Sequence, residues 1–112
     1  MKRLAILVLS ALACSLTVPS WAQGQVSREQ RDQFAQRTVD RCIQSQRADP
    51  TNAAQTDAAV REFCACYSRR VADALPDDVL NTSVSAATPE QLTATQSIMR
   101  QSAQACRSAA QP

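Results

Sequence analysis

Apolar side chains recur at intervals of three and four residues through the middle of the chain, which is the spacing of one face of an α-helix. The clearest run is Val60, Cys64, Tyr67, Val71 and Leu75. It predicts a helix from about Ala53 to Ala74 with one face in the core. No segment shows the alternation of apolar and polar residues, bounded by turn signals, that is typical of a β-strand.

Start and stop signals predict another helix on the N-terminal side of this run. Ser27 and Gln30 have the spacing of a capping box, and the helix should continue to about Arg47. Pro50 disfavours helix at Asp49 and turns the chain. The residues expected to face inward are Phe34, Thr38, Val39, Cys42 and Ile43.

Two further helices are predicted after the central one. Pro76 and the acidic pair Asp77-Asp78 suit the first turn of a short helix that ends at about Val84, because acidic side chains are stabilised at helix N-termini. Thr88-Pro89-Glu90-Gln91 is a clear start signal, and the last helix should run to about Ala109. Its expected inward stripe is Leu92, Thr95, Met99, Ala103 and Cys106.

The predicted fold is therefore all-α: a small antiparallel bundle of three long helices and one short helix, forming a single domain over residues 23–112. Large apolar side chains are few, and a chain of this size buries a limited share of its surface. We expect disulfides to help hold such a thin core.

Residues 1–22 have the features of a bacterial secretory signal peptide. Lys2 and Arg3 precede an uncharged apolar stretch. Ser20-Trp21-Ala22 then places small residues three positions and one position before a cleavage site, so the mature chain should begin at Gln23.

An uncleaved membrane anchor and a lipoprotein are the alternatives to a cleaved signal. The apolar stretch is shorter than the roughly 20 residues that a membrane span needs. Cys14 follows small residues and is a candidate for lipidation, but a large aliphatic residue is wanted where Ala11 stands. We expect a periplasmic or secreted bacterial protein that is not attached to a membrane after cleavage.

Loss of the signal peptide also changes the charge. Without Lys2 and Arg3, the 12 basic residues fall to 10 and balance the 10 acidic ones. The remaining cations are all arginines, scattered among the acids. Nucleic acids and anionic membranes bind clustered positive charge, so neither is expected as a partner.

Four cysteines remain after cleavage, an even number in an oxidising compartment, which favours two disulfides. They are Cys42, Cys64, Cys66 and Cys106. Residues two apart on a helix point about 200° away from each other, so a bond between Cys64 and Cys66 is excluded. Each must bond a different one of Cys42 and Cys106, and both remaining pairings satisfy this geometry.

The chain contains no histidine, which excludes His-dependent nucleophile pairs and every metal site that includes a histidine. The pair Asp77-Asp78 is explained by a helix start. We therefore expect no catalytic residue, no cofactor and no metal. The alternative is a metal-binding or thiol-redox protein that works through the four mature cysteines, since thiolates bind soft metals and exchange with disulfides.

In its pattern of Cys42, Phe63-Cys64-Ala65-Cys66-Tyr67 and Cys106 behind a signal peptide, the chain resembles small exported helical proteins of proteobacteria. Many of these have one cysteine, then an aromatic-Cys-x-Cys core, and a fourth cysteine near the end. The resemblance implies a helical fold and no particular activity. A weaker similarity is to periplasmic immunity proteins, which are small, helical and disulfide-bonded and neutralise toxins that attack the cell wall.

The leading hypothesis is a non-catalytic binding module whose partner is another protein, for example an enzyme or toxin that it inhibits. Arg69 and Arg70 are a candidate docking point for an acidic partner. Asp73 lies three or four residues further along the helix and is expected to pair with one of them. Neither the identity of the partner nor the oligomeric state follows from the sequence.

Overall fold

The computed structural model describes residues 24–110, and all regular structure in that range is helical. The three long helices are α1 (Arg28–Ala48), α2 (Asp57–Ala74) and α4 (Pro89–Ala110). The short helix is α3 (Asp77–Leu80), and two 3₁₀ turns are η2 (Pro50–Asn52) and η3 (Val84–Ala86). The predicted all-α fold of three long helices and one short helix is confirmed.

Three predictions fall outside the described residues: the signal peptide, its cleavage between Ala22 and Gln23, and the lipidation of Cys14. Between residues 24 and 110, none of the helices combines the length and the apolar character that a membrane crossing requires.

The first and last long helices begin at the predicted capping signals. The Ser27 hydroxyl accepts from the Gln30 backbone nitrogen at 3.1 Å, and the Gln30 side chain accepts from the Ser27 nitrogen at 2.8 Å. Thr88 and Gln91 make the same reciprocal pair at the start of α4. Each box satisfies backbone donors that the first helical turn leaves unpaired.

Two predicted boundaries are wrong. α2 begins at Asp57 instead of near Ala53, because η2 takes up the first residues after α1 and Thr56 serves as the N-cap. α3 ends at Leu80 instead of Val84, because Val84 belongs to the separate turn η3. Both segments are rich in small or polar residues, which suit short turns as well as helices.

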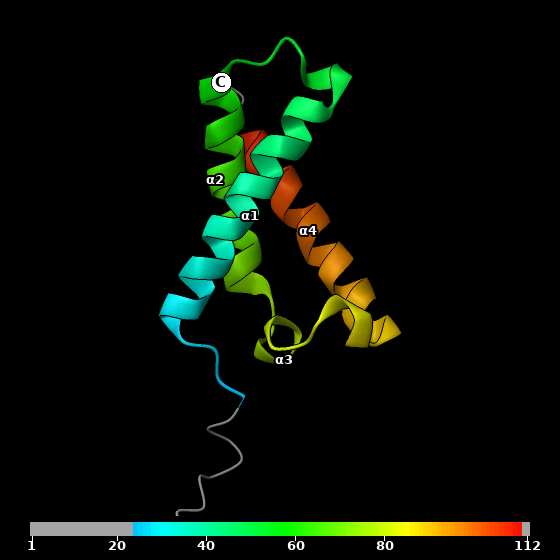
Figure 1. Cartoon of the computed structure of the whole chain (residues 1–112). Helices are drawn as coiled ribbons and strands as arrows, with labels where there is room; N and C mark the ends of the chain where they lie inside the picture. Colours follow the sequence, from blue (N-terminus) through cyan, green and yellow to red (C-terminus); the bar gives the residue numbers. More distant parts are fainter. Residues whose placement is uncertain (1–23, 111–112) are drawn as a thin grey trace, which may run out of the picture.

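α2 is the central helix and contacts both α1 and α4. Figure 1 shows that α1 and α2 run in opposite directions and cross, and that α4 runs antiparallel to α2. The C-terminal end of α4 lies against α2, and the helix diverges from α2 toward the end of the bundle where α3 lies. The bundle is therefore tightest on the side away from α3.

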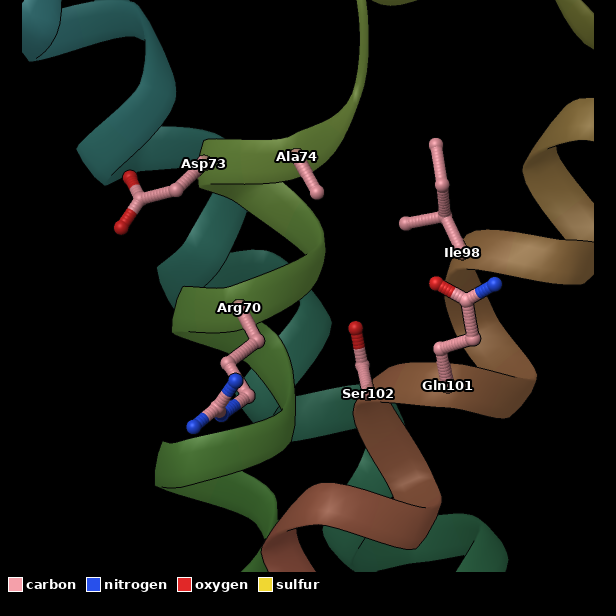
Figure 2. A pocket seen from close by; sticks show the side chains of 6 residues that line it. All are labelled: Arg70, Asp73, Ala74, Ile98, Gln101 and Ser102. Carbon is pink, nitrogen blue, oxygen red and sulfur yellow. The ribbon is translucent and has the colours of Figure 1, made fainter.

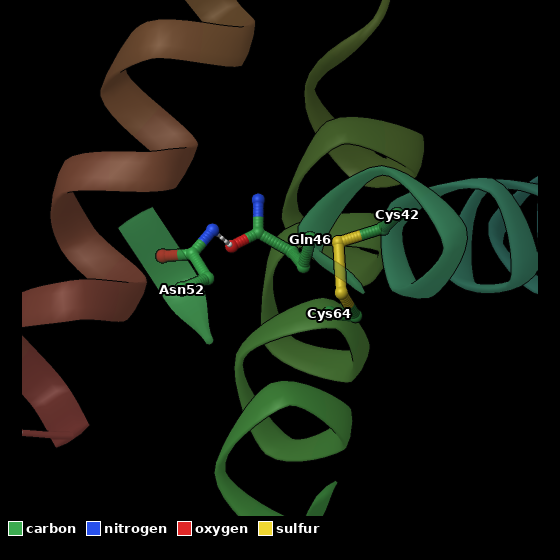
Figure 3. Close-up of a disulfide and its surroundings, with 4 residues drawn as sticks. All are labelled: Cys42, Gln46, Asn52 and Cys64. Atoms are coloured by element: carbon green, nitrogen blue, oxygen red, sulfur yellow. Dashed lines mark hydrogen bonds between the residues drawn. A yellow bond between two sulfur atoms is a disulfide. The ribbon is translucent and has the colours of Figure 1, made fainter. Parts of the chain in front are cut away.

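Two disulfides join α2 to its neighbours. Cys42 of α1 is bonded to Cys64 with an S–S distance of 2.09 Å (Figure 3), and Cys66 is bonded to Cys106 of α4 with an S–S distance of 2.07 Å. Cys64 and Cys66 thus bond to different helices, in one of the two pairings that the sequence leaves open. Disulfides are typical of proteins in oxidising compartments.

Arg31 of α1 fastens the end of α2 to the start of α3. Its guanidinium group donates to the backbone oxygens of Ala72 and Leu75 and forms an ion pair with the Asp77 carboxylate. The Arg31 side chain is only 18% exposed. Because the last carbonyls of a helix have no partner within the helix, this one side chain satisfies groups that would otherwise depend on water.

The buried core is small and is formed mainly by one side of α2. Its apolar members are Ala35, Cys42, Val60, Cys64, Val71, Ala72, Leu75 and Cys106. Leu92 and Met99, predicted to face inward from α4, are each 42% exposed. The prediction fails for these two residues because α4 diverges from α2 over its N-terminal half, where its apolar face lacks a full packing surface.

Candidate functional site

An apolar pocket of about 210 Å³ lies where α4 diverges from α2. Its apolar lining comes from α1, α3, α4, η3 and the C-cap of α2, and includes Phe34, Leu75, Val79, Leu80, Val84 and Leu92. Leu75 is 4% exposed, whereas Leu92 is 42% and Val84 is 85% exposed. The pocket therefore has a buried floor and a rim of apolar side chains that solvent reaches.

A second hollow of about 420 Å³, the Arg70 pocket, lies between the same two helices. Figure 2 shows residues of α2 on one wall and residues of α4 on the other, with the Ser102 hydroxyl between the helices and the Asp73 carboxylate turned toward α1. The lining residues are Arg70, Asp73, Ala74, Ile98, Gln101 and Ser102. Ser102 is 6% exposed, so this wall holds a nearly buried hydroxyl group.

The two pockets are neighbours. Ala74 lines the Arg70 pocket and Leu75, the next residue, lines the apolar pocket. On α4, Ile98 of the Arg70 pocket lies one helical turn after Thr95 of the apolar pocket. A ligand segment that extends along the space between α2 and α4 can therefore contact both.

The structure separates the two arginines that the sequence singles out for docking. Arg69 forms an ion pair with Asp32 of α1 at 2.6 Å. Asp73, expected to pair with Arg69 or Arg70, instead pairs with Arg28 of α1 at 3.1 Å. The expectation fails because carboxylates and guanidinium groups of α1 lie opposite this face of α2. Among residues 24–110, Arg70 is in no ion pair.

All four predicted disulfide cysteines are oxidised in the structure, and Cys64 is fully buried. Between residues 24 and 110, no group of three or more histidine, cysteine, aspartate or glutamate residues is placed to hold a metal ion. A metal site made of all four cysteine thiolates would therefore require both disulfides to be reduced.

Two side chains of the described chain have shifted pKa values, and neither lines these two pockets. Hydrogen bonds from the side chain and then the backbone of Thr51 lower the pKa of Asp49 below its ordinary value. Burial raises the pKa of Tyr67. The two pockets thus offer apolar contact, hydrogen bonding and two charged groups, the Arg70 guanidinium and the Asp73 carboxylate that pairs with Arg28.

Sequence reasoning singles out Arg70 but misses the apolar pocket. Helical periodicity predicts which face of an element is apolar, and says nothing about which elements diverge. The apolar pocket is lined by residues from five elements, and helical periodicity cannot predict that these residues come together. The available signal was Val79, Leu80 and Val84, which are large apolar residues in a segment too short to bury them by itself.

Comparison of the chain with protein-family models, with curated proteins and with solved structures found no match. The functional interpretation of the two pockets therefore rests on their own geometry and chemistry.

Proposed function

We propose that the mature chain is a non-catalytic binding module that acts in the bacterial periplasm or outside the cell, and that its partner is another protein. The observation that carries this proposal is the apolar pocket, which is open to solvent at Val84 and Leu92 and has the Arg70 pocket beside it. A leader with the features of a signal peptide and two disulfides support the compartment.

The size of the apolar pocket favours a protein partner over a small molecule. Small-molecule sites have volumes of about 300–1,000 Å³, whereas this pocket has about 210 Å³. That volume suits one large apolar side chain. Protein interfaces concentrate their binding energy in such anchors, which fill a desolvated pocket and are surrounded by polar contacts.

Arg70 adds a preference for an acidic segment. Its side chain lines the Arg70 pocket and is in no ion pair within residues 24–110, whereas Arg69, its neighbour in the sequence, pairs with Asp32. A partner carboxylate that enters the Arg70 pocket would meet this positive charge. The partner segment should therefore carry a large apolar residue with an acidic residue close by.

The disulfide-bonded helices suit a module that presents a fixed surface to its partner. α2 is bonded covalently to both of its neighbours, which limits the movement of the helices that carry the two pockets. Binding to a preorganised surface avoids part of the entropy cost of association. An inhibitor or an immunity protein is one form of such a module.

Site-specific photo-crosslinking in the native host tests the proposal. A photoreactive residue at Val84, on the rim of the apolar pocket, should give one discrete adduct. The same residue at Ala54, in the exposed turn before α2, should not. The partner identified by mass spectrometry is then purified for calorimetry.

Variants that introduce or reverse a charge complete the test with the purified partner. Leu92→Asp should abolish binding, because it places a carboxylate on the rim of the apolar pocket. Arg70→Glu should weaken binding, and Arg61→Glu, the same change on an exposed residue of the same helix, should not. Equal adducts from Val84 and Ala54, or no effect of Leu92→Asp, would contradict the proposal.

A further inference from the structure

A third hollow lies at the other end of the bundle, where α1, η2, the start of α2 and the last turns of α4 meet. Its volume is about 420 Å³, and its lining includes Gln46, Asp49, Asn52, Gln55, Phe63 and Arg107. We call it the Arg107 pocket. It shares no lining residue with the apolar pocket or the Arg70 pocket.

One wall of the Arg107 pocket is a chain of three hydrogen-bonded amide side chains. The Asn52 side-chain nitrogen donates to the Gln46 side-chain oxygen at 3.0 Å (Figure 3), and the Gln55 side-chain nitrogen donates to the Asn52 side-chain oxygen at 3.0 Å. Gln46 and Asn52 are half-buried. The wall therefore offers ordered amide donors and acceptors, and further hydrogen-bonding capacity remains on each group.

A carboxylate, that of Asp49, also lines the Arg107 pocket. The Asp49 Oδ1 atom accepts from the Thr51 nitrogen at 2.9 Å and from the Thr51 hydroxyl at 2.7 Å. These bonds lower the pKa of Asp49, so the group is ionised at neutral pH. They occupy Oδ1 and hold the carboxylate in one orientation, which leaves Oδ2 available to a ligand.

A guanidinium group supplies the opposite charge. Arg107 of α4 lies over the ring of Phe63, with 5.7 Å between its Cζ atom and the ring centroid. The ring of Phe63 is in turn stacked with that of Tyr67 at a centroid separation of 5.9 Å. Cation–π contact favours this placement of the charge. Neither Asp49 nor Arg107 is in an ion pair within the part of the chain that the structure describes.

We propose that the Arg107 pocket binds a small zwitterion of the amino-acid type, such as a dipeptide. Its carboxylate would bond to Arg107, its ammonium group to Asp49 and its peptide group to the amide side chains that line the same pocket. Opposite charges that line one hollow without pairing to each other match the two ends of such a ligand. The volume of about 420 Å³ lies in the range of small-molecule sites.

The test uses the disulfide-bonded mature protein and three probes: the dipeptide alanyl-alanine, its N-acetyl derivative and its C-terminal amide. Amide chemical shifts are followed by NMR during titration. Alanyl-alanine should shift resonances of η2 and the end of α4 at millimolar concentrations. Each blocked derivative should bind roughly tenfold more weakly, because each loses one charge-assisted hydrogen bond.

Two variants test which residue contacts each charged end of the dipeptide. Asp49→Asn keeps an N-cap of η2, since asparagine caps as well as aspartate, and should bind alanyl-alanine and its N-acetyl derivative equally. Arg107→Gln should bind alanyl-alanine and its amide equally. Arg100→Gln, an exposed residue two turns earlier on α4 that does not line the pocket, should behave as the unaltered protein.

Three results would overturn this assignment: no shifts with alanyl-alanine, shifts that map to another part of the bundle, or equal binding of the three probes by the unaltered protein. The outcome is independent of the protein-binding proposal, because the two sites share no residue.

Discussion

Cys66 of α2 is bonded to Cys106 near the end of α4, with 5.8 Å between the two Cα atoms. The bond holds one end of α4 against the central helix, while the other half of α4 diverges from it. Both pockets between α2 and α4 lie on the diverging side. Their shape therefore depends on this single covalent anchor.

We predict that Cys66→Ser combined with Cys106→Ser releases α4. The bond spans 40 positions, and its loss should lower the free energy of unfolding by roughly 3 to 4 kcal/mol. Hydrogen exchange should accelerate most along α4, because α1 and α2 stay joined by Cys42–Cys64.

The matched control is Cys42→Ser combined with Cys64→Ser, a bond that spans 22 positions. It should accelerate exchange at the crossing of α1 and α2 and leave the end of α4 attached. If both double variants gave the same exchange pattern, α4 would not depend on its own disulfide.

Arg31 should matter for stability far more than the other arginines of its helix. Arg31→Met leaves the Ala72 and Leu75 carbonyls and the Asp77 carboxylate without their shared donor, and should cost about 1–3 kcal/mol. Arg28→Met breaks ion pairs of an arginine that is 66% exposed, and should cost at most about 1 kcal/mol. Urea denaturation followed by circular dichroism measures the free energy of unfolding of both variants. Equal losses of stability would contradict the role of Arg31 in joining α2 to α3.

Ser68 is a buried position where removal of a polar group should be tolerated. Its side chain is fully buried, and its hydroxyl oxygen has no hydrogen-bond partner in the structure. Burial of an unpaired hydroxyl is unfavourable, so Ser68→Ala should leave the melting temperature unchanged or raise it. A clear fall in the melting temperature would mean that the hydroxyl has a partner.

The pKa of Asp49 should depend on Thr51. Hydrogen bonds from Thr51 hold the pKa of Asp49 below its ordinary value of 3.8. Because the pKa is lower in the folded state, the hydrogen bonds from Thr51 to the Asp49 carboxylate stabilise the fold at pH values above the unfolded-state pKa of Asp49. This stabilisation is lost as pH falls through the folded-state pKa. NMR titration should show the Asp49 pKa rising toward 3.8 in Thr51→Ala, and an unchanged pKa would rule out this cause.

Sequence signals predict this fold well where all the residues that matter lie close together in the chain. The Ser27–Gln30 and Thr88–Gln91 boxes start helices in the structure as predicted, because capping depends on residues within one turn. The spacing of Cys64 and Cys66 likewise excludes a bond between them.

Relations between elements are harder to predict from the sequence. The choice between the two disulfide pairings depends on which side of α2 each neighbour occupies, and both choices satisfy the geometry of α2 alone. The partner of Asp73 lies on α1, 45 positions away, so helical spacing within α2 could not identify it. The apolar pocket depends on the angle at which α4 leaves α2, which no single-helix pattern contains.

The most direct test of the central claim is disulfide mapping of the protein purified from its native host without reductant. Peptide mass spectrometry should find Cys42 bonded to Cys64, Cys66 bonded to Cys106, no free thiol, and Gln23 as the first residue. This result is expected of an exported binding module whose helices are joined by two disulfides. Four free thiols with a stoichiometric bound metal would contradict it and would favour a thiol-based metal site.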